Sequence, residues 1–227
     1  MKKILEETLE KNIELNKSNL VIQTFGNLSI KIDKELFAIK PSGVDLSSIK
    51  SNEISIVDLD GKHLAGLQPS VDTPTHVYLY KNFKSLKSIV HTHSLYASSW
   101  AQSLMSIPAY GTTHADSANG DLLCTRKLIQ SEIENNYEHN TGVVIKETLD
   151  INHIKISDLP GILVGSHGVF SWGANSKESL NNAEIIEYIA KLAYLTKKIN
   201  SKSIPIDKYL NSFHFNRKHG PNNYYGQ

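Results

Sequence analysis

The residues of this chain best suited to chemistry are two histidines, His91 and His93, at the end of the apolar run 88–90. Side chains alternate along a β-strand, so residues two positions apart point to the same face. Two imidazoles on one face of a strand end can bind one divalent metal ion. A lone His-x-His is more often a surface or hydrogen-bonded pair, so this pattern alone leaves the metal site open.

Two further residues of ligand type favour the metal interpretation. Asp72 lies in the segment 69–76, and His167 follows the apolar strand 161–166. Three histidines and one carboxylate form a set that suits Zn²⁺, with positions open for substrate, and that also accepts Mn²⁺ or Co²⁺. We therefore expect Asp72, His91, His93 and His167 to converge in the fold.

Two short glycine-containing loops are candidates for binding an anion. Gly26-Asn27 and Lys40-Pro41-Ser42-Gly43 both lie at predicted strand ends. Such loops expose backbone N–H groups, and their Ser and Lys side chains add donors, which suits a phosphate. Both sequences are also common turns, so each interpretation remains open. Ser70 would add a hydroxyl near a metal-bound substrate.

Acid/base candidates lie in two polar segments. Asp116 ends the segment 111–116 and can act as a general acid or base, although taken alone the segment is better explained as a capped turn. His114 is expected to be a structural hydrogen-bonding partner. The C-terminal segment 213–227 combines two tyrosines with an Arg-Lys-His cluster and shows no helical or strand periodicity. Such a segment is either a frayed terminus or one that orders against a neighbouring subunit.

Composition excludes several classes of protein. The chain has 227 residues and a net charge of +1 without clustered basic residues, which argues against a nucleic-acid or membrane partner. Its single cysteine, Cys124, cannot form an intrachain disulfide and is expected in a buried segment rather than as a nucleophile. No signal region or apolar stretch of about 20 residues is present, so we expect a cytoplasmic protein of one domain, 1–227.

The spacing of apolar residues predicts the helices and strands that hold these residues. Apolar spacing predicts a helix over 3–14, hairpins over 28–40 and 54–64, and a helix over 94–104. A helix is expected to start near Pro74, and Asn175 with Glu178 resembles a capping box that opens the longest helix. These elements predict an α/β fold with three layers, α/β/α, around a central mixed, largely antiparallel sheet.

Taken together, these segments resemble the class II (metal-dependent) sugar-phosphate aldolase family, and within it the branch of pentulose-phosphate 4-epimerases. The resemblance runs in order from end to end of the chain. It is carried by 24–27, 39–45, 72–76, 89–94, Ile107-Pro108 through 111–116, 124–127, 166–168, 217–220 and 224–227.

The resemblance implies a metal, usually zinc, bound by Asp72, His91, His93 and His167. It implies a substrate and phosphate site made of Gly26, Asn27, Lys40, Ser42, Gly43, Ser70, Val71 and Thr112, with His214 and Arg217 in support, and an acid/base pair of Asp116 and Tyr225. The implied reaction interconverts L-ribulose 5-phosphate and D-xylulose 5-phosphate. The implied assembly is a homotetramer in which the C-terminal segment, about 213–227, reaches a neighbour's site.

One residue departs from the family pattern, and two other activities remain open. Where the family reads Ser-Ser-Asp, this chain reads Ser70-Val71-Asp72, which removes one hydroxyl donor. The alternatives are an aldolase acting on a fuculose- or rhamnulose-type phosphate, and a non-catalytic, adducin-like interaction domain. The sequence leaves open whether the pathway is arabinose or ascorbate breakdown.

Overall fold

A computed structural model describes residues 1–221 and 223–225, and a seven-stranded sheet lies at its centre. The strand order is β4-β3-β2-β1-β5-β7-β6, and every pairing between these strands is antiparallel. The strands are β1 (Asn27–Lys31), β2 (Leu36–Ile39), β3 (Ser55–Asp58), β4 (His63–Ala65), β5 (Ser88–Thr92), β6 (Gly161–Val164) and β7 (Gly168–Gly173). Among the described residues, the only parallel pairing of the expected mixed sheet is an isolated bridge between Cys124 and Leu163.

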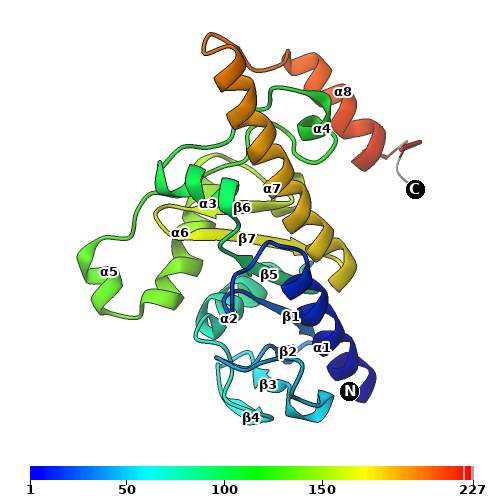
Figure 1. Ribbon diagram of the computed structural model, residues 1–227, viewed down its shortest axis with the longest axis vertical. Coiled ribbons are helices and arrows are strands. Elements are labelled where there is room, and N and C mark those ends of the chain that lie inside the picture. The colour runs from blue at the N-terminus through cyan, green and yellow to red at the C-terminus, as the bar shows by residue number, and fades with distance from the viewer. Residues whose placement is uncertain (222, 226–227) are drawn as a thin grey trace.

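Helices cover both faces of the sheet, as the α/β prediction requires (Figure 1). One layer holds α1 (Lys2–Lys17), α3 (Leu95–Gln102) and α7 (Ser176–Ile199), and the other holds α2 (Thr73–Asn82) and α6 (Tyr137–Ile151). Shorter elements are α4 (Thr112–Ala115), α5 (Gln130–Glu134) and the 3₁₀ turns Ser51–Glu53 and Ile156–Asp158. At one end of the molecule α8 (Lys208–His219) lies against α4.

Strand alternation divides the core between these two layers. Ile89 and Phe170 belong to the cluster beneath α2 and α6, whereas Val90 and Val169 belong to clusters beneath α1, α3 and α7. All four side chains are buried. Successive residues of a strand face opposite ways, so a strand between two helical layers needs apolar residues at both positions.

The local signals in the sequence confirm most of the predicted elements. The hairpins become β1–β2 and β3–β4, and the first helix becomes α1. Asn175 Oδ1 accepts a hydrogen bond of 2.8 Å from the Glu178 N–H, which starts α7 where the capping signal places it. The Glu178 carboxylate accepts the N–H of Ala174 at 2.9 Å and completes the cap.

The irregular C-terminal segment predicted from residue 213 is wrong for residues 213–219, which form the last part of α8. Asp207 caps this helix by accepting the Tyr209 N–H at 2.7 Å, and Phe215 is buried. Asn211 and Phe215 are the buried residues of α8, so its sequence shows only a weak apolar stripe; His214 and Arg217 also bind Asp116, the residue that follows α4. Residues 222, 226 and 227, which include the end of the resemblance, lie outside the described residues.

Within residues 1–221 and 223–225, no helix is both long enough and apolar enough to cross a membrane.

Candidate metal centre and active site

The three histidines predicted as ligands converge on one point. His91 and His93 come from the end of β5, and His167 lies in the turn between β6 and β7. The ligand atoms of this triad all lie within 4.8 Å of one another. The Nε2 atoms of His91 and His93 are 2.9 Å apart. Antiparallel pairing of β5 with β7 explains the convergence, because it sets the β6–β7 turn beside the end of β5.

The chemistry of the triad fits a divalent metal ion. The Nδ1–H of His91 donates to the Val169 carbonyl at 2.9 Å, which leaves the Nε2 lone pair facing His93. Burial, reinforced by the neighbouring histidines, lowers the pKa of His93 to about 4 and that of His167 to about 3. Both rings are therefore neutral at neutral pH, the form that binds metal. The three histidines make a group that can hold a metal ion.

Asp72 lies in the same pocket but not in the group of three. It occupies the N-cap position of α2, where its side chain makes no capping hydrogen bond, and its Oδ2 instead accepts 2.7 Å from Asn27 Nδ2. Burial acts to raise the pKa of Asp72, but the nearby histidines and the Asn27 bond outweigh it and lower that pKa. The Asp72 carboxylate is thus charged, and it interacts electrostatically with the histidines of the triad.

The predicted anion loops line the same pocket as the triad, a cavity of about 350 Å³. Every proposed phosphate residue from the first third of the chain contributes to it: Gly26, Asn27, Lys40, Ser42, Gly43, Ser70 and Val71. Burial lowers the pKa of Lys40, while Asp72 acts to raise it, and Lys40 Nζ donates to the Thr24 carbonyl at 2.8 Å. The tertiary fold therefore brings the candidate metal ligands and the candidate anion-binding loops to one cavity.

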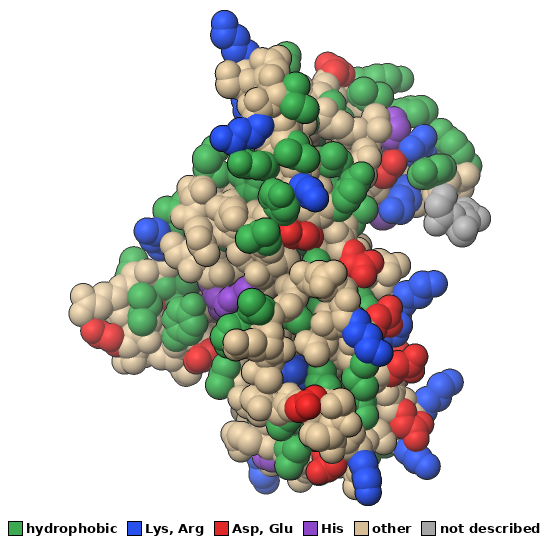
Figure 2. Space-filling model, viewed as in Figure 1, with side chains coloured by type: hydrophobic (Ala, Val, Ile, Leu, Met, Phe, Trp, Pro, Cys, Tyr) green, Lys and Arg blue, Asp and Glu red, His purple; other side chains and the backbone are tan. Residues whose placement is uncertain are grey.

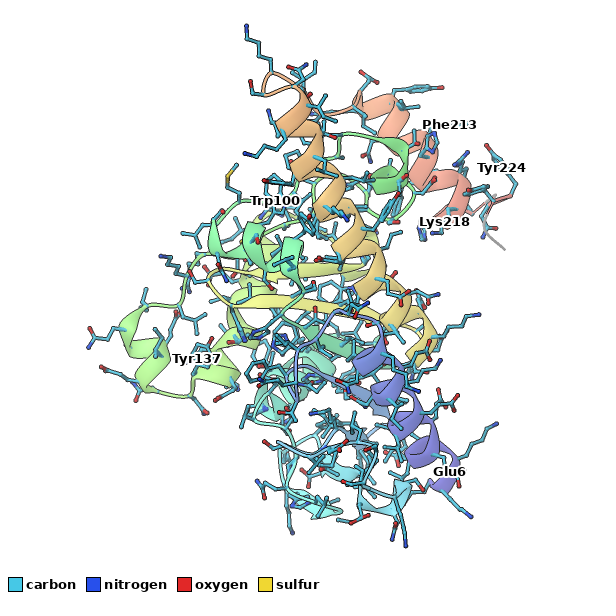
Figure 3. The ribbon with its side chains drawn as sticks, viewed as in Figure 1. Glu6, Trp100, Tyr137, Phe213, Lys218 and Tyr224 are labelled. Atoms are coloured by element: carbon cyan, nitrogen blue, oxygen red, sulfur yellow. The ribbon has the colours of Figure 1, made fainter. Side chains whose placement is uncertain are left out.

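Four residues of this pocket were not among the predicted site residues: Thr24 and Phe25, which precede the first loop, and Tyr137 and Glu138. Tyr137 and Glu138 line it from the start of α6, which follows Asn136 in a left-handed conformation with φ 82°. Burial raises the pKa of Tyr137. The segment 128–140 carries no recognisable chemical motif, and a single sequence gives no signal that its helix start faces β5. Figure 3 places the labelled Tyr137 on the side of the molecule away from α8.

The predicted acid/base residues form a second group, at the contact between α4 and α8. Asp116 Oδ1 accepts from His214 Nδ1 at 3.0 Å, and Arg217 donates to both Asp116 oxygens at 3.1 and 3.0 Å. The Arg217 guanidinium carbon lies 4.0 Å from the centre of the Tyr225 ring. Asp116, His214, Arg217 and Tyr225 are called the α4–α8 group below. Thr112 lies beside it, exposed, at the first residue of α4.

Electrostatics keep Asp116 ionised in this group. Burial acts to raise the pKa of its carboxyl, but hydrogen bonds from Arg217 and His214 outweigh it and lower that pKa. Asp116 therefore accepts protons only weakly while Arg217 holds it. His114, expected as a structural partner, donates from Nε2 to the Gly120 carbonyl at 3.0 Å and braces the loop after α4.

The described chain does not bring the two groups together. Among residues 1–221 and 223–225, no member of the α4–α8 group lines the metal pocket. Figure 3 shows the separation: Tyr137 of the pocket and Tyr224 beyond α8 lie at opposite sides of the molecule. A site that uses both groups must draw them from two chains.

Cys124 gives no support to a nucleophilic role. The residue is half-buried, and burial raises the pKa of its thiol to about 11. The thiolate is the reactive form, so this thiol is inert at neutral pH. Its neighbour Leu122 is fully buried, in agreement with the interpretation of 122–124 as a packed segment.

Comparisons with known proteins identify the family to which this chain belongs. Residues 6–194 match the sequence model of a family described as the class II aldolase and adducin N-terminal domain. The chain is 46% identical over 230 residues to the L-ribulose-5-phosphate 4-epimerase UlaF of Salmonella paratyphi C (strain RKS4594), and the match covers 100% of both proteins. The protein of the same name from Salmonella choleraesuis (strain SC-B67) matches to the same extent.

Solved structures share the fold at low sequence identity. An L-fuculose 1-phosphate aldolase superposes with a TM-score of 0.80 at 23% identity, covering 95% of each chain. YgbL of Escherichia coli, described as a putative aldolase/epimerase/decarboxylase, gives a TM-score of 0.75 at 20% identity and covers 94% of this chain and 98% of its own. At this identity the likeness establishes the fold and not the reaction.

Proposed function

The chain belongs to the class II aldolase and adducin N-terminal domain family, and from this premise we propose that it is an L-ribulose-5-phosphate 4-epimerase. The enzyme interconverts L-ribulose 5-phosphate and D-xylulose 5-phosphate. One structural observation carries the proposal: the histidine triad and the predicted phosphate loops line a single cavity of about 350 Å³. A small sugar phosphate needs that combination, because its hydroxyl and carbonyl oxygens bind a metal while its phosphate binds backbone and side-chain donors.

In this proposal His91, His93, His167 and Asp72 hold a divalent ion, Zn²⁺ in the first place and Mn²⁺ or Co²⁺ as alternatives. When bound, the ion supplies a Lewis acid for the electrons released by cleavage of the C3–C4 bond. Asn27 orients Asp72 toward the pocket through its 2.7 Å hydrogen bond. Proton abstraction at C4 would be unfavourable because C4 is not adjacent to the C2 carbonyl, so inversion proceeds by retro-aldol cleavage and re-formation.

The phosphate loops keep the cleaved aldehyde in place. Gly26, Ser42, Gly43 and Ser70 bind the phosphate, and Lys40 adds a buried positive charge. Held at its phosphate, the aldehyde can turn its other face to the three-carbon fragment before the bond re-forms. Retention of both fragments is what makes the reaction an epimerisation rather than an aldol cleavage with release.

Asp116 and Tyr225 exchange the C4 hydroxyl proton, one on each face of the aldehyde. They belong to the α4–α8 group and are supplied to the pocket by a neighbouring chain. Arg217 orients Asp116 and keeps it ionised through a two-point contact, and its guanidinium carbon lies 4.0 Å from the Tyr225 ring centre. His214 completes the support of Asp116, and Thr112 lies at the start of the same helix.

We propose that the neighbouring chain belongs to a homotetramer of single-domain chains, 1–227, whose C-terminal segments reach their neighbours. Exposed apolar side chains support an assembly of this kind. Figure 2 shows hydrophobic side chains gathered over the half of the molecule that holds α3, α7 and α8. Leu95 of α3 is 72% exposed, Tyr188 of α7 is 54% exposed and Tyr209 of α8 is 81% exposed. Surfaces of this kind mark sites of protein contact.

The test is a direct assay of the isomerisation. The protein is incubated with L-ribulose 5-phosphate and Zn²⁺, with and without a chelator, and D-xylulose 5-phosphate is followed. We expect product only in the presence of metal. A folded, metal-loaded protein that forms no product would refute the epimerase and favour the aldolase, and a protein that binds no metal would favour the non-catalytic, adducin-like domain.

A further inference from the structure

The helix α3 connects the two segments that carry the histidine triad. Its N-cap, Ser94, directly follows His93. At its other end, the Ala101 carbonyl accepts the Ser166 N–H at 2.9 Å, one residue before His167. Ser166 has a left-handed backbone with φ 61°, a conformation that non-glycine residues seldom adopt. The hydrogen bond to Ala101 helps to hold this conformation. The position of α3 therefore sets the position of His93 relative to His167.

The start of α3 is capped by a residue far away in the sequence. Ser94 makes no side-chain capping bond, and its hydroxyl is buried without a partner among the described residues. The two oxygens of Glu187, on α7, instead accept the N–H groups of Tyr96 and Ala97 at 2.8 and 2.9 Å. A carboxylate at a helix N-terminus satisfies the free N–H groups and opposes the positive end of the helix dipole.

Packing between α3 and α7 reinforces the same contact. Trp100 Nε1 donates to the Ala190 carbonyl at 3.1 Å, one turn of α7 beyond Glu187. Ala97 and Ala101 of α3 are fully buried, in one cluster with Ile186 and Ala190 of α7. Small residues at this contact let the two helices approach closely, so α7 is a rigid support for α3.

We propose that Glu187 is a positioning residue for the metal centre. Its carboxylate fixes the start of α3, and α3 in turn holds the segments of His93 and His167 at the separation that a metal ion requires. This inference rests on the proposed function in one respect only, namely that the triad binds a metal. Glu187 is not among the described residues that line the pocket of the triad, so its effect on the metal site passes through the backbone of α3.

The experiment measures Co²⁺ binding and the Co²⁺ absorption spectrum in the full-length protein, together with thermal unfolding. Glu187→Ala removes both capping bonds. Glu187→Gln keeps the shape and one acceptor oxygen. Glu184→Ala is the matched control, because it removes an exposed carboxylate from the same helix α7.

We expect Glu187→Ala to weaken Co²⁺ binding by about 10-fold or more, in the range found for groups that orient metal ligands, and to shift the absorption spectrum. Glu187→Gln should fall between Glu187→Ala and the wild type, and Glu184→Ala should match the wild type. Unchanged affinity and spectrum in folded Glu187→Ala, even with a lowered Tm, would reduce Glu187 to an ordinary helix cap and overturn the inference. Should Glu187→Ala not fold, the same criterion applies to Glu187→Gln.

A wild-type protein that bound no Co²⁺ would instead refute the metal site on which the proposed function depends. The two failures are therefore distinguishable, because one appears in the wild type and the other only in the variants.

Discussion

The separation of the metal pocket from the α4–α8 group predicts that activity can be restored by mixing two inactive variants. His93→Asn removes one member of the triad, and His93 is its most exposed member, so the fold should tolerate the change. Tyr225→Phe removes one proposed proton-transfer group and leaves the pocket of its own chain untouched, since Tyr225 does not line that pocket. Each variant alone should lose most of its turnover, about 10²–10⁴-fold for the tyrosine.

The expected recovery follows from counting sites in a closed ring of four chains. In the proposed tetramer, each active site takes its pocket from one chain and its α4–α8 group from a neighbour. A site is intact only when the pocket comes from a Tyr225→Phe chain and the α4–α8 group from a His93→Asn chain. Random assembly of equal amounts makes this pairing in about one quarter of the sites, so about a quarter of the wild-type turnover should return.

The assay is the conversion of L-ribulose 5-phosphate by mixed oligomers formed through joint expression, with their composition checked by mass spectrometry. Wild type mixed with the double variant provides the control. That mixture should keep about one quarter of its sites if each site needs two chains, and about one half if each chain holds a complete site. Mixed oligomers of the two single variants that show no recovery would refute the two-chain site.

Four further outcomes are expected. Gly26→Ala should destabilise the protein by about 1–3 kcal/mol in chemical unfolding, because Gly26 has φ 77° and an added Cβ would lie 2.5 Å from Val21 Cγ1. Val71→Ser should change kcat/KM by no more than about 2-fold, because the Val71 side chain is 65% exposed at the pocket rim; a large gain would show that its missing hydroxyl matters. Zn²⁺ at about 100 times its Kd should stabilise the protein by about 2.7 kcal/mol in thermal unfolding, and a chelator should reverse this. Asp116→Asn should lower Tm at neutral pH through loss of the Arg217 contact, and the difference from wild type should shrink as the pH falls below about 4.

The sign of the last effect follows from the lowered pKa of Asp116. A carboxyl whose pKa is lower in the folded state contributes its stabilisation fully above the unfolded value of about 3.9. That contribution is lost as the pH falls through the folded pKa. A difference in Tm between wild type and Asp116→Asn that instead grew in acid would contradict the assignment of an ionised Asp116 paired with Arg217.

Local patterns predicted much of the fold correctly. The alternation in 28–32 and 54–57 gave β-strands, the Asn175–Glu178 signal located the start of α7, and Asp72 with Pro74 marked the start of α2. The sequence of 213–219 shows no helical periodicity, because only Asn211 and Phe215 of α8 are buried. The segment 128–140 carried no motif, so its approach to the pocket through Tyr137 and Glu138 was not foreseen.

Residue types and two-residue spacing in the sequence indicate the chemistry that is available: nitrogen ligands at a strand end, donors in two glycine-containing loops, and an acidic residue in a polar turn. Both are local properties of the chain. Which of these groups come together depends on the tertiary fold. Antiparallel pairing of β5 with β1 and β7 sets His91 beside Asn27 and close to the turn of His167, whereas the contact of α8 with α4 keeps Asp116 and Tyr225 away from them. These contacts join residues that lie far apart in the sequence, so no local sequence pattern predicts them.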